Sequence, residues 1–98
     1  MSIKAVSWAL EQYVSDPVAK LVLIGIADRY NDERGYAWPS VAWLATAASV
    51  TDRTVQRKIK LLEAQGFLAT TRRKGSTTHY HLHIEAVLPE VTGVLKEV

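Results

Sequence analysis

The lysine and arginine side chains of this sequence are concentrated in one stretch. Residues 51–81 hold seven basic groups and two acidic ones, a net charge of +5, whereas residues 1–50 carry −1 and residues 82–98 carry −2. The basic groups of this stretch are Arg53, Arg57, Lys58, Lys60, Arg72, Arg73 and Lys74. Such a cluster is typical of a surface that binds phosphate, although a solvated basic face without a partner would have the same composition.

The first half of this stretch has the spacing of an amphipathic helix over residues 51–65. At about 100° per residue, Val55, Ile59 and Leu62 share a narrow arc, which would face a core. The opposite arc is rich in long hydrogen-bond donors. Arginine matches the edge of guanine in the major groove of DNA, and glutamine matches adenine. The side chains that we expect to contact bases are Arg53, Thr54, Gln56, Arg57 and Lys60.

A helix whose charges serve only solvation is the alternative interpretation. Such helices usually mix charges of both signs, often with glutamate four residues before lysine. Here the outer face is basic over two turns, and a second basic cluster follows in a predicted hairpin, so we favour DNA binding. Hydroxyl groups near these clusters are neutral donors to phosphate. The residues expected to contact the DNA backbone are Ser40, Ser49, Thr51, Lys58, Arg72, Arg73, Lys74, Ser76, Thr77, Thr78 and His79.

Hydrophobic periodicity and capping residues predict the elements that position these side chains. The expected order is a helix over 3–13, a helix over 17–30, a short strand over 36–38, helices over 41–47 and 51–65, and strands over 67–73 and 78–84. Ser15 or Asp16 would cap the second helix, Ser40 the third and Thr51 the fourth. The first helix is predicted from an apolar stripe, which comprises Ile3, Val6, Leu10 and Tyr13.

Two short helices joined by a tight turn and followed by a hairpin are the layout of a winged helix-turn-helix. The expected fold is therefore mainly α, with a small β-hairpin as the wing. A chain of 98 residues is long enough for one such domain, which we place at residues 1–84. Residues 85–98 would form a C-terminal tail, linker or short helix.

Five segments resemble the winged helix-turn-helix domain of bacteriophage and plasmid replication-initiation proteins and related regulators. They are KAVSWALEQ, KLVLIGIADRYND, YAWPSVAWLA, TDRTVQRKIKLLEAQGFL and GSTTHYHL. The resemblance implies double-stranded DNA binding, with recognition by Thr51 to Lys60 and support from the hairpin. It does not distinguish replication initiation from transcription regulation. The family usually has glycine in the turn between the two helices, where this sequence has Ser49, which predicts an unfavourable φ.

Other chemistry has weaker support in the sequence. His79, His81 and His83 alternate and would share one strand face, but no third zinc ligand accompanies a pair of them, so we expect no metal and no cofactor. The tryptophans are assigned to core packing rather than to stacking on single-stranded nucleic acid. They are Trp8, Trp38 and Trp43. No nucleophile lies in a catalytic motif, so no enzyme activity is expected.

No membrane association is expected either, because the longest apolar run, Leu21 to Ile26, is far shorter than the roughly 18 residues of a membrane span. The sequence contains no cysteine and does not begin with a signal peptide, which favours a cytoplasmic protein.

The tail has a stripe of its own at near-heptad spacing. Leu88, Val91, Leu95 and Val98 form it, and Pro89 suits the first turn of a helix. This pattern fits a homodimer contact, a segment folded back on the domain, or a link to a further domain. For the whole protein, the alternative to DNA binding is a winged-helix module that binds other proteins.

Overall fold

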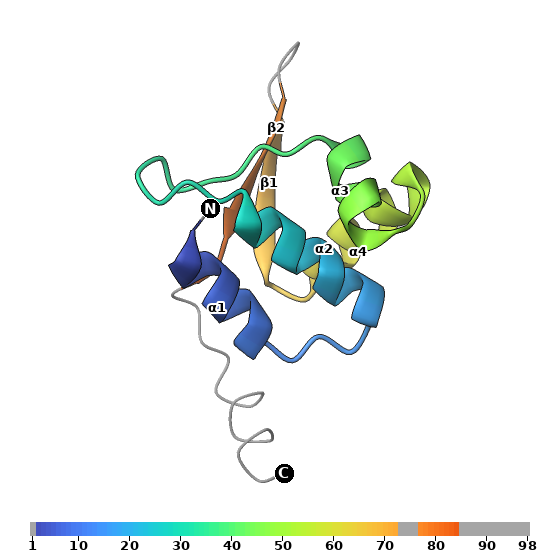
Figure 1. The fold of residues 1–98 in the computed structure, drawn as a ribbon, viewed down its shortest axis with the longest axis horizontal. Coiled ribbons are helices and arrows are strands. Elements are labelled where there is room, and N and C mark those ends of the chain that lie inside the picture. Colours follow the sequence, from blue (N-terminus) through green and yellow to red (C-terminus); the bar gives the residue numbers. More distant parts are fainter. Residues whose placement is uncertain (1, 73–76, 85–98) are drawn as a thin grey trace, which may run out of the picture.

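The computed structural model describes residues 2–72 and 77–84 of the chain. Four helices are followed by an antiparallel hairpin (Figure 1). The elements are α1 (Ile3–Glu11), α2 (Pro17–Asp28), α3 (Val41–Ala48), α4 (Asp52–Ala64), β1 (Leu68–Arg72) and β2 (Thr78–Leu82). This order confirms the predicted winged helix-turn-helix fold. The tail over 85–98 and the hairpin residues 73–76 lie outside the described part.

Side-chain caps explain where the helices begin. The carboxylate of Asp16 accepts hydrogen bonds from the backbone N–H groups of Val18 and Ala19, so Asp16, and not Ser15, caps α2. Pro17 follows at the first helical position, where a missing N–H costs nothing. Ser40 and Thr51 cap α3 and α4 in the same way. Each cap satisfies an N–H that would otherwise lack a partner and contributes about 0.5–2 kcal/mol.

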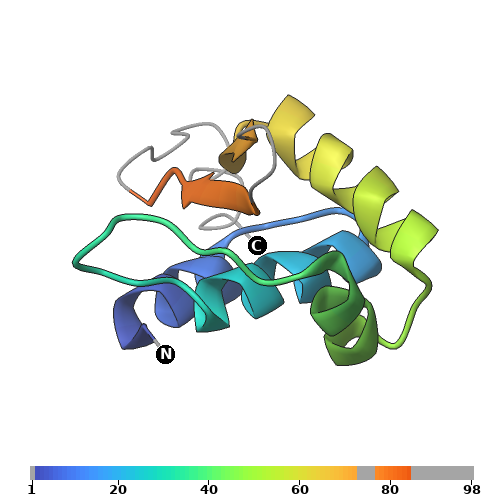
Figure 2. The same ribbon diagram turned by 90° about the horizontal axis from the view of Figure 1, so that it is seen from above.

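Helix α2 is the centre of the packing, with contacts to α1, α3 and α4 (Figure 2). Its side chains Val22, Leu23 and Ile26 are fully buried. The predicted apolar arc of α4 is confirmed: all three of its members are buried, and Val55 and Leu62 are fully so. This burial determines which face of α4 is left for solvent.

Gly25 brings α2 and α3 close together. A Cβ atom placed on it would lie 3.1 Å from Cδ2 of Leu44 and 3.6 Å from Cζ3 of Trp43. Both of these side chains belong to α3, and Leu44 is fully buried. A larger residue at position 25 would therefore push α3 away from the centre of the domain.

The hairpin pairs Leu68 with Leu82 and Arg72 with Thr78 at its two ends. Instead of the predicted strand over 36–38, a pair of backbone hydrogen bonds joins Ala37 and Tyr80, at N···O distances of 2.8 and 2.9 Å. Pro39 explains why the pairing is so short, because proline has no N–H with which to extend a ladder.

Helix α1 packs through a different face from the one that its stripe suggested. The buried residues are Ala5, Trp8 and Ala9, whereas Ile3 is 77% and Leu10 56% exposed. The ring of Trp8 meets Phe67 edge-on at a centroid distance of 6.5 Å. Both faces of this helix are apolar, so periodicity predicted the helix but did not indicate which face would be buried.

Two leucines of α2 test this account of the core. We expect Leu23→Ala to lower the free energy of unfolding by about 2–5 kcal/mol, because it opens a cavity beneath three helices. Leu21 is 47% exposed, so Leu21→Ala, the matched control, should change it by less than about 0.5 kcal/mol. Urea unfolding of both variants measures the difference. Equal losses would contradict the assignment of α2 as the central helix.

Candidate nucleic-acid interface

The turn between α3 and α4 is closed by Ser49 in the left-handed conformation, with φ 58° and ψ 44°. Its N–H donates to the carbonyl of Thr46, and the N–H of Val50 donates to that of Ala45. The unfavourable φ predicted at Ser49 is therefore confirmed. A non-glycine residue in this conformation costs roughly 1–2 kcal/mol, which the two hydrogen bonds and the packing of both helices must offset.

The hydrogen-bond donors predicted on the outer face of α4 are exposed to solvent. Arg53, Gln56, Arg57 and Lys60 are all exposed. Thr54 is half-buried, and its hydroxyl accepts a hydrogen bond from that of Thr51 at 3.1 Å. Thr54 therefore supports the start of α4 and is less accessible than its four neighbours.

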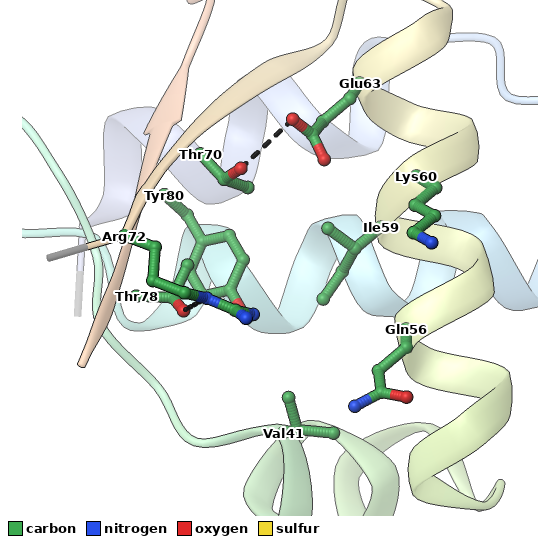
Figure 3. Close-up of a pocket in the computed structure, with 9 residues that line it drawn as sticks. All are labelled: Val41, Gln56, Ile59, Lys60, Glu63, Thr70, Arg72, Thr78 and Tyr80. Atoms are coloured by element: carbon green, nitrogen blue, oxygen red, sulfur yellow. Dashed lines mark hydrogen bonds between the residues drawn. The ribbon is translucent and has the colours of Figure 1, made fainter. Parts of the chain in front are cut away.

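A hollow of about 280 Å³ separates α4 from the hairpin (Figure 3). We call it the binding groove. Its lining residues are Val41, Gln56, Ile59, Lys60, Glu63, Thr70, Arg72, Thr78 and Tyr80. Gln56 and Arg72 extend into it from opposite sides (Figure 3). The structure thus brings residues predicted from α4 and from the wing to one surface.

Two hydrogen bonds organise the polar groups of the binding groove. Nε of Arg72 donates to the hydroxyl of Thr78 at 3.4 Å. The hydroxyl of Thr70 donates to the carboxylate of Glu63 at 3.1 Å. A second hollow, of about 370 Å³, is lined in part by the same side chains and adds Pro39, Ser40 and Thr77. Ser40, the cap of α3 and an expected backbone contact, therefore lies next to the groove, in the second hollow.

Lys58, one of the expected contacts to the DNA backbone, is paired within the domain. Its ammonium group lies 2.5 Å from a carboxylate oxygen of Asp16, and both side chains are only a quarter exposed. The hydrogen bond from Lys58, followed by that from the backbone N–H of Ala19, holds the pKa of Asp16 below its usual range. Lys58 therefore joins α4 to the beginning of α2 and does not line the groove.

His79, another expected contact to the DNA backbone, packs against a side chain of the domain. Its ring stacks on Tyr36 at a centroid distance of 4.2 Å and an interplanar angle of 13°. Because strand side chains alternate, His79 points away from the face on which Tyr80 lines the groove. The other two histidines bond elsewhere, His81 to the hydroxyl of Thr71 and His83 to the carbonyl of Gly66. Within the described ranges, no three potential metal ligands lie together.

The tryptophans occupy three different environments. Trp8 is buried, as predicted, and Trp43 is half-buried under the guanidinium of Arg29, 4.2 Å from its ring centroid. The prediction was wrong for Trp38, which is 43% exposed and lies against Tyr36 at a ring distance of 5.4 Å. The sequence pattern did not indicate that Trp38 would be exposed beside the half-buried Tyr36, although the adjacent Pro39 marks an edge where burial ends.

Three of the expected backbone contacts lie outside the described residues, namely Arg73, Lys74 and Ser76. Of the remainder, Ser49 is exposed in the turn, and Ser40 and Thr51 use their side-chain oxygens as helix caps. Among the helices that the structure describes, none is both long enough and apolar enough to cross a membrane.

The fold and the basic groove together define a helix-turn-helix domain with a wing. Residues 16–68 match the family model of a helix-turn-helix domain, which covers 53 of the 98 residues. The chain therefore belongs to this helix-turn-helix domain family. Searches of curated proteins and of solved structures returned no significant match. The matched range contains α2, α3 and α4 and ends at the first residue of β1.

The ion pair between Lys58 and Asp16 predicts a pH dependence of stability. A carboxylate whose pKa is lowered by folding stabilises the native state above its unfolded pKa, near 3.9, and this contribution is lost as the pH falls through the folded pKa. We expect Asp16→Asn, which keeps a good helix cap, to lose less stability than the native chain between pH 5 and about 2. Urea midpoints across this range measure it.

The exposed Glu33 supplies the control for this experiment, as Glu33→Gln removes a carboxylate that no cap or ion pair of the described residues uses. The loss of stability of Glu33→Gln between pH 5 and about 2 should equal that of the native chain. If Asp16→Asn showed the same profile too, Asp16 would contribute no charge-dependent stability.

Proposed function

We propose that this domain binds double-stranded DNA, with α4 in the major groove and the hairpin on the flanking backbone. The observation that supports this proposal most directly is that Gln56 and Lys60 of α4 line the same groove as Arg72 of the hairpin. Glu63 is the acidic residue among its lining side chains, and it accepts a hydrogen bond from Thr70. A duplex phosphate would therefore meet a surface of mostly positive charge.

The dimensions of α4 suit this role. Its 13 residues give a length of about 20 Å, and a major groove about 12 Å wide admits such a helix. Arg53, Gln56, Arg57 and Lys60 would contact base edges, since they share the face opposite the core. The turn residue Ser49 would contact the backbone together with the polar side chains around the groove.

Contacts to phosphate are assigned to both sides of the groove. Among the described residues, the proposed phosphate contacts are Ser40, Ser49, Thr51, Arg72, Thr77 and Thr78. Between the two strands, they are Arg73, Lys74 and Ser76. We assign Lys58 and His79 to positioning rather than contact, because the first holds Asp16 and the second stacks on Tyr36. Thr54 supports the cap of α4 beside the proposed base contacts.

The biological role that we propose is replication initiation or transcription regulation in a phage, plasmid or bacterium. Its support is the resemblance of five segments to replication-initiation proteins and related regulators. Both roles require a protein that distinguishes its site from other duplexes, and the exposed arginine and glutamine side chains of α4 have the chemistry for that.

A protein-binding module is the second candidate function. The observation that favours it is the exposed Trp38, which lies against the half-buried Tyr36 and has the guanidinium of Arg34 5.8 Å from its ring centroid. Tyrosine, tryptophan and arginine are the residues most enriched at the energetic centres of protein interfaces. Duplex affinity measured from 50 to 200 mM salt separates the two, since only phosphate binding gives a steep decline.

Arg57→Ala tests the base contacts of α4. After selection of a preferred duplex, we expect this variant to lose about 10- to 100-fold in affinity for that duplex and much less for random DNA, because a bidentate base contact discriminates by about 1–3 kcal/mol. Fluorescence anisotropy measures both. Arg34→Ala also removes one positive charge, but outside the groove. It should leave the ratio of the affinities for the preferred and the random duplex unchanged. An equal loss on both duplexes would assign Arg57 to the DNA backbone instead.

The wing is tested by replacing Arg72, Arg73 and Lys74 together with alanine. Affinity should then fall on every duplex, and the slope of log affinity against log salt should become shallower by about 0.9 for each phosphate group that the variant no longer neutralises. Arg34→Ala again serves as the charge control. A slope equal to that of the native chain would mean that the wing does not touch DNA.

A further inference from the structure

Helix α1 has a second apolar face that nothing in the described part of the chain covers. Ile3, Val6 and Leu10 recur at intervals of three and four residues, opposite the buried Ala5 and Ala9. Ile3 is 77% and Leu10 56% exposed, and Val6 is partly buried at the border with the core. We call these three residues the outer stripe of α1.

Such a stripe is unusual on the surface of a small domain. A helix that is apolar on both sides is normally covered on both sides. Contiguous exposed apolar residues, in contrast with single ones, mark a surface that binds something. The outer stripe therefore has the composition of a docking surface.

The chain leaves the hairpin beside α1. After β2, the N–H of His83 donates to the carbonyl of Phe67 at 3.0 Å. The ring of Phe67 in turn packs edge-on against Trp8 of α1, and Ile84 packs against the core. The sequence that follows Ile84 therefore starts next to the helix that carries the outer stripe.

This following sequence carries a matching stripe. Leu88, Val91 and Leu95 are separated by three and four residues, the same intervals as in the outer stripe. Two stripes with equal spacing on antiparallel or parallel helices can interdigitate along their whole length. Four residues from Ile84 to Leu88 span up to about 13 Å, slightly more than the 10–12 Å diameter of a helix, so Leu88 can lie beside α1.

We propose that residues 88–98 form a helix that docks on the outer stripe of α1 in the same chain. The short connection gives the tail a high effective concentration at α1, which favours its own chain over a second copy. Helices α1 and α4 lie on different sides of α2 (Figure 2). The docked tail therefore leaves the binding groove open, and the proposal does not depend on DNA binding.

Disulfide trapping tests the proposal in the full-length protein, which contains no native cysteine. In a chain with Leu10→Cys and Leu95→Cys, mild oxidation should give mainly monomers with an internal disulfide on a non-reducing gel. A chain with Thr46→Cys and Leu95→Cys is the control, since Thr46 is exposed on α3. Disulfide-linked dimers would overturn the proposal in favour of a second copy, and internal bonding no greater than in the control would overturn it altogether.

Thiol accessibility gives an independent measurement. Leu10→Cys in the full chain should react with a maleimide about ten times faster when Leu95→Asp is added, which corresponds to a docked fraction near nine-tenths. The reaction of Thr46→Cys should be unaffected by Leu95→Asp. Equal rates for Leu10→Cys with and without Leu95→Asp would exclude docking. Because Leu10 is exposed in the domain itself, its replacement should not disturb folding.

Discussion

The packing of α4 against the core is the constraint on which the rest of this domain depends. Val55, Ile59 and Leu62 are buried, and a helix with one buried arc has only one possible rotation about its axis. This rotation places the long polar side chains on the free face. The ion pair of Lys58 with Asp16 holds the same helix from its flank, while the groove side is bordered by the hairpin. The position of the exposed polar face of α4 is thus a consequence of core packing.

Features that depend on neighbours in the sequence were predictable. The caps at Ser40 and Thr51 and the buried arc of α4 follow from spacings of three or four residues, over which helical geometry is fixed. The left-handed conformation of Ser49 was predicted from the family resemblance, because the family usually has glycine at this turn. These local rules were sufficient for the fold class and for the exposed donors of α4.

Features that depend on long-range pairing were not predictable. The partner of Lys58 is 42 residues away in the sequence, and the stack of Tyr36 on His79 joins a loop to a strand. No periodicity encodes such pairs. The burial of α1 was ambiguous for a different reason, since two of its faces are apolar and the smaller side chains allow the closer approach. Alanine at positions 5 and 9 was the overlooked signal.

The close approach at Gly25 has a consequence for how such a domain diverges. Helix α3 packs closely against Gly25 of α2, which has no side chain, and α3 in turn contacts α4. The distance of the exposed face of α4 from the centre of the domain therefore depends on a buried position of α2. The exposed face of α4 can therefore change in descendants of this protein through the interior as well as through its own side chains, and a comparison restricted to the surface residues would miss that route.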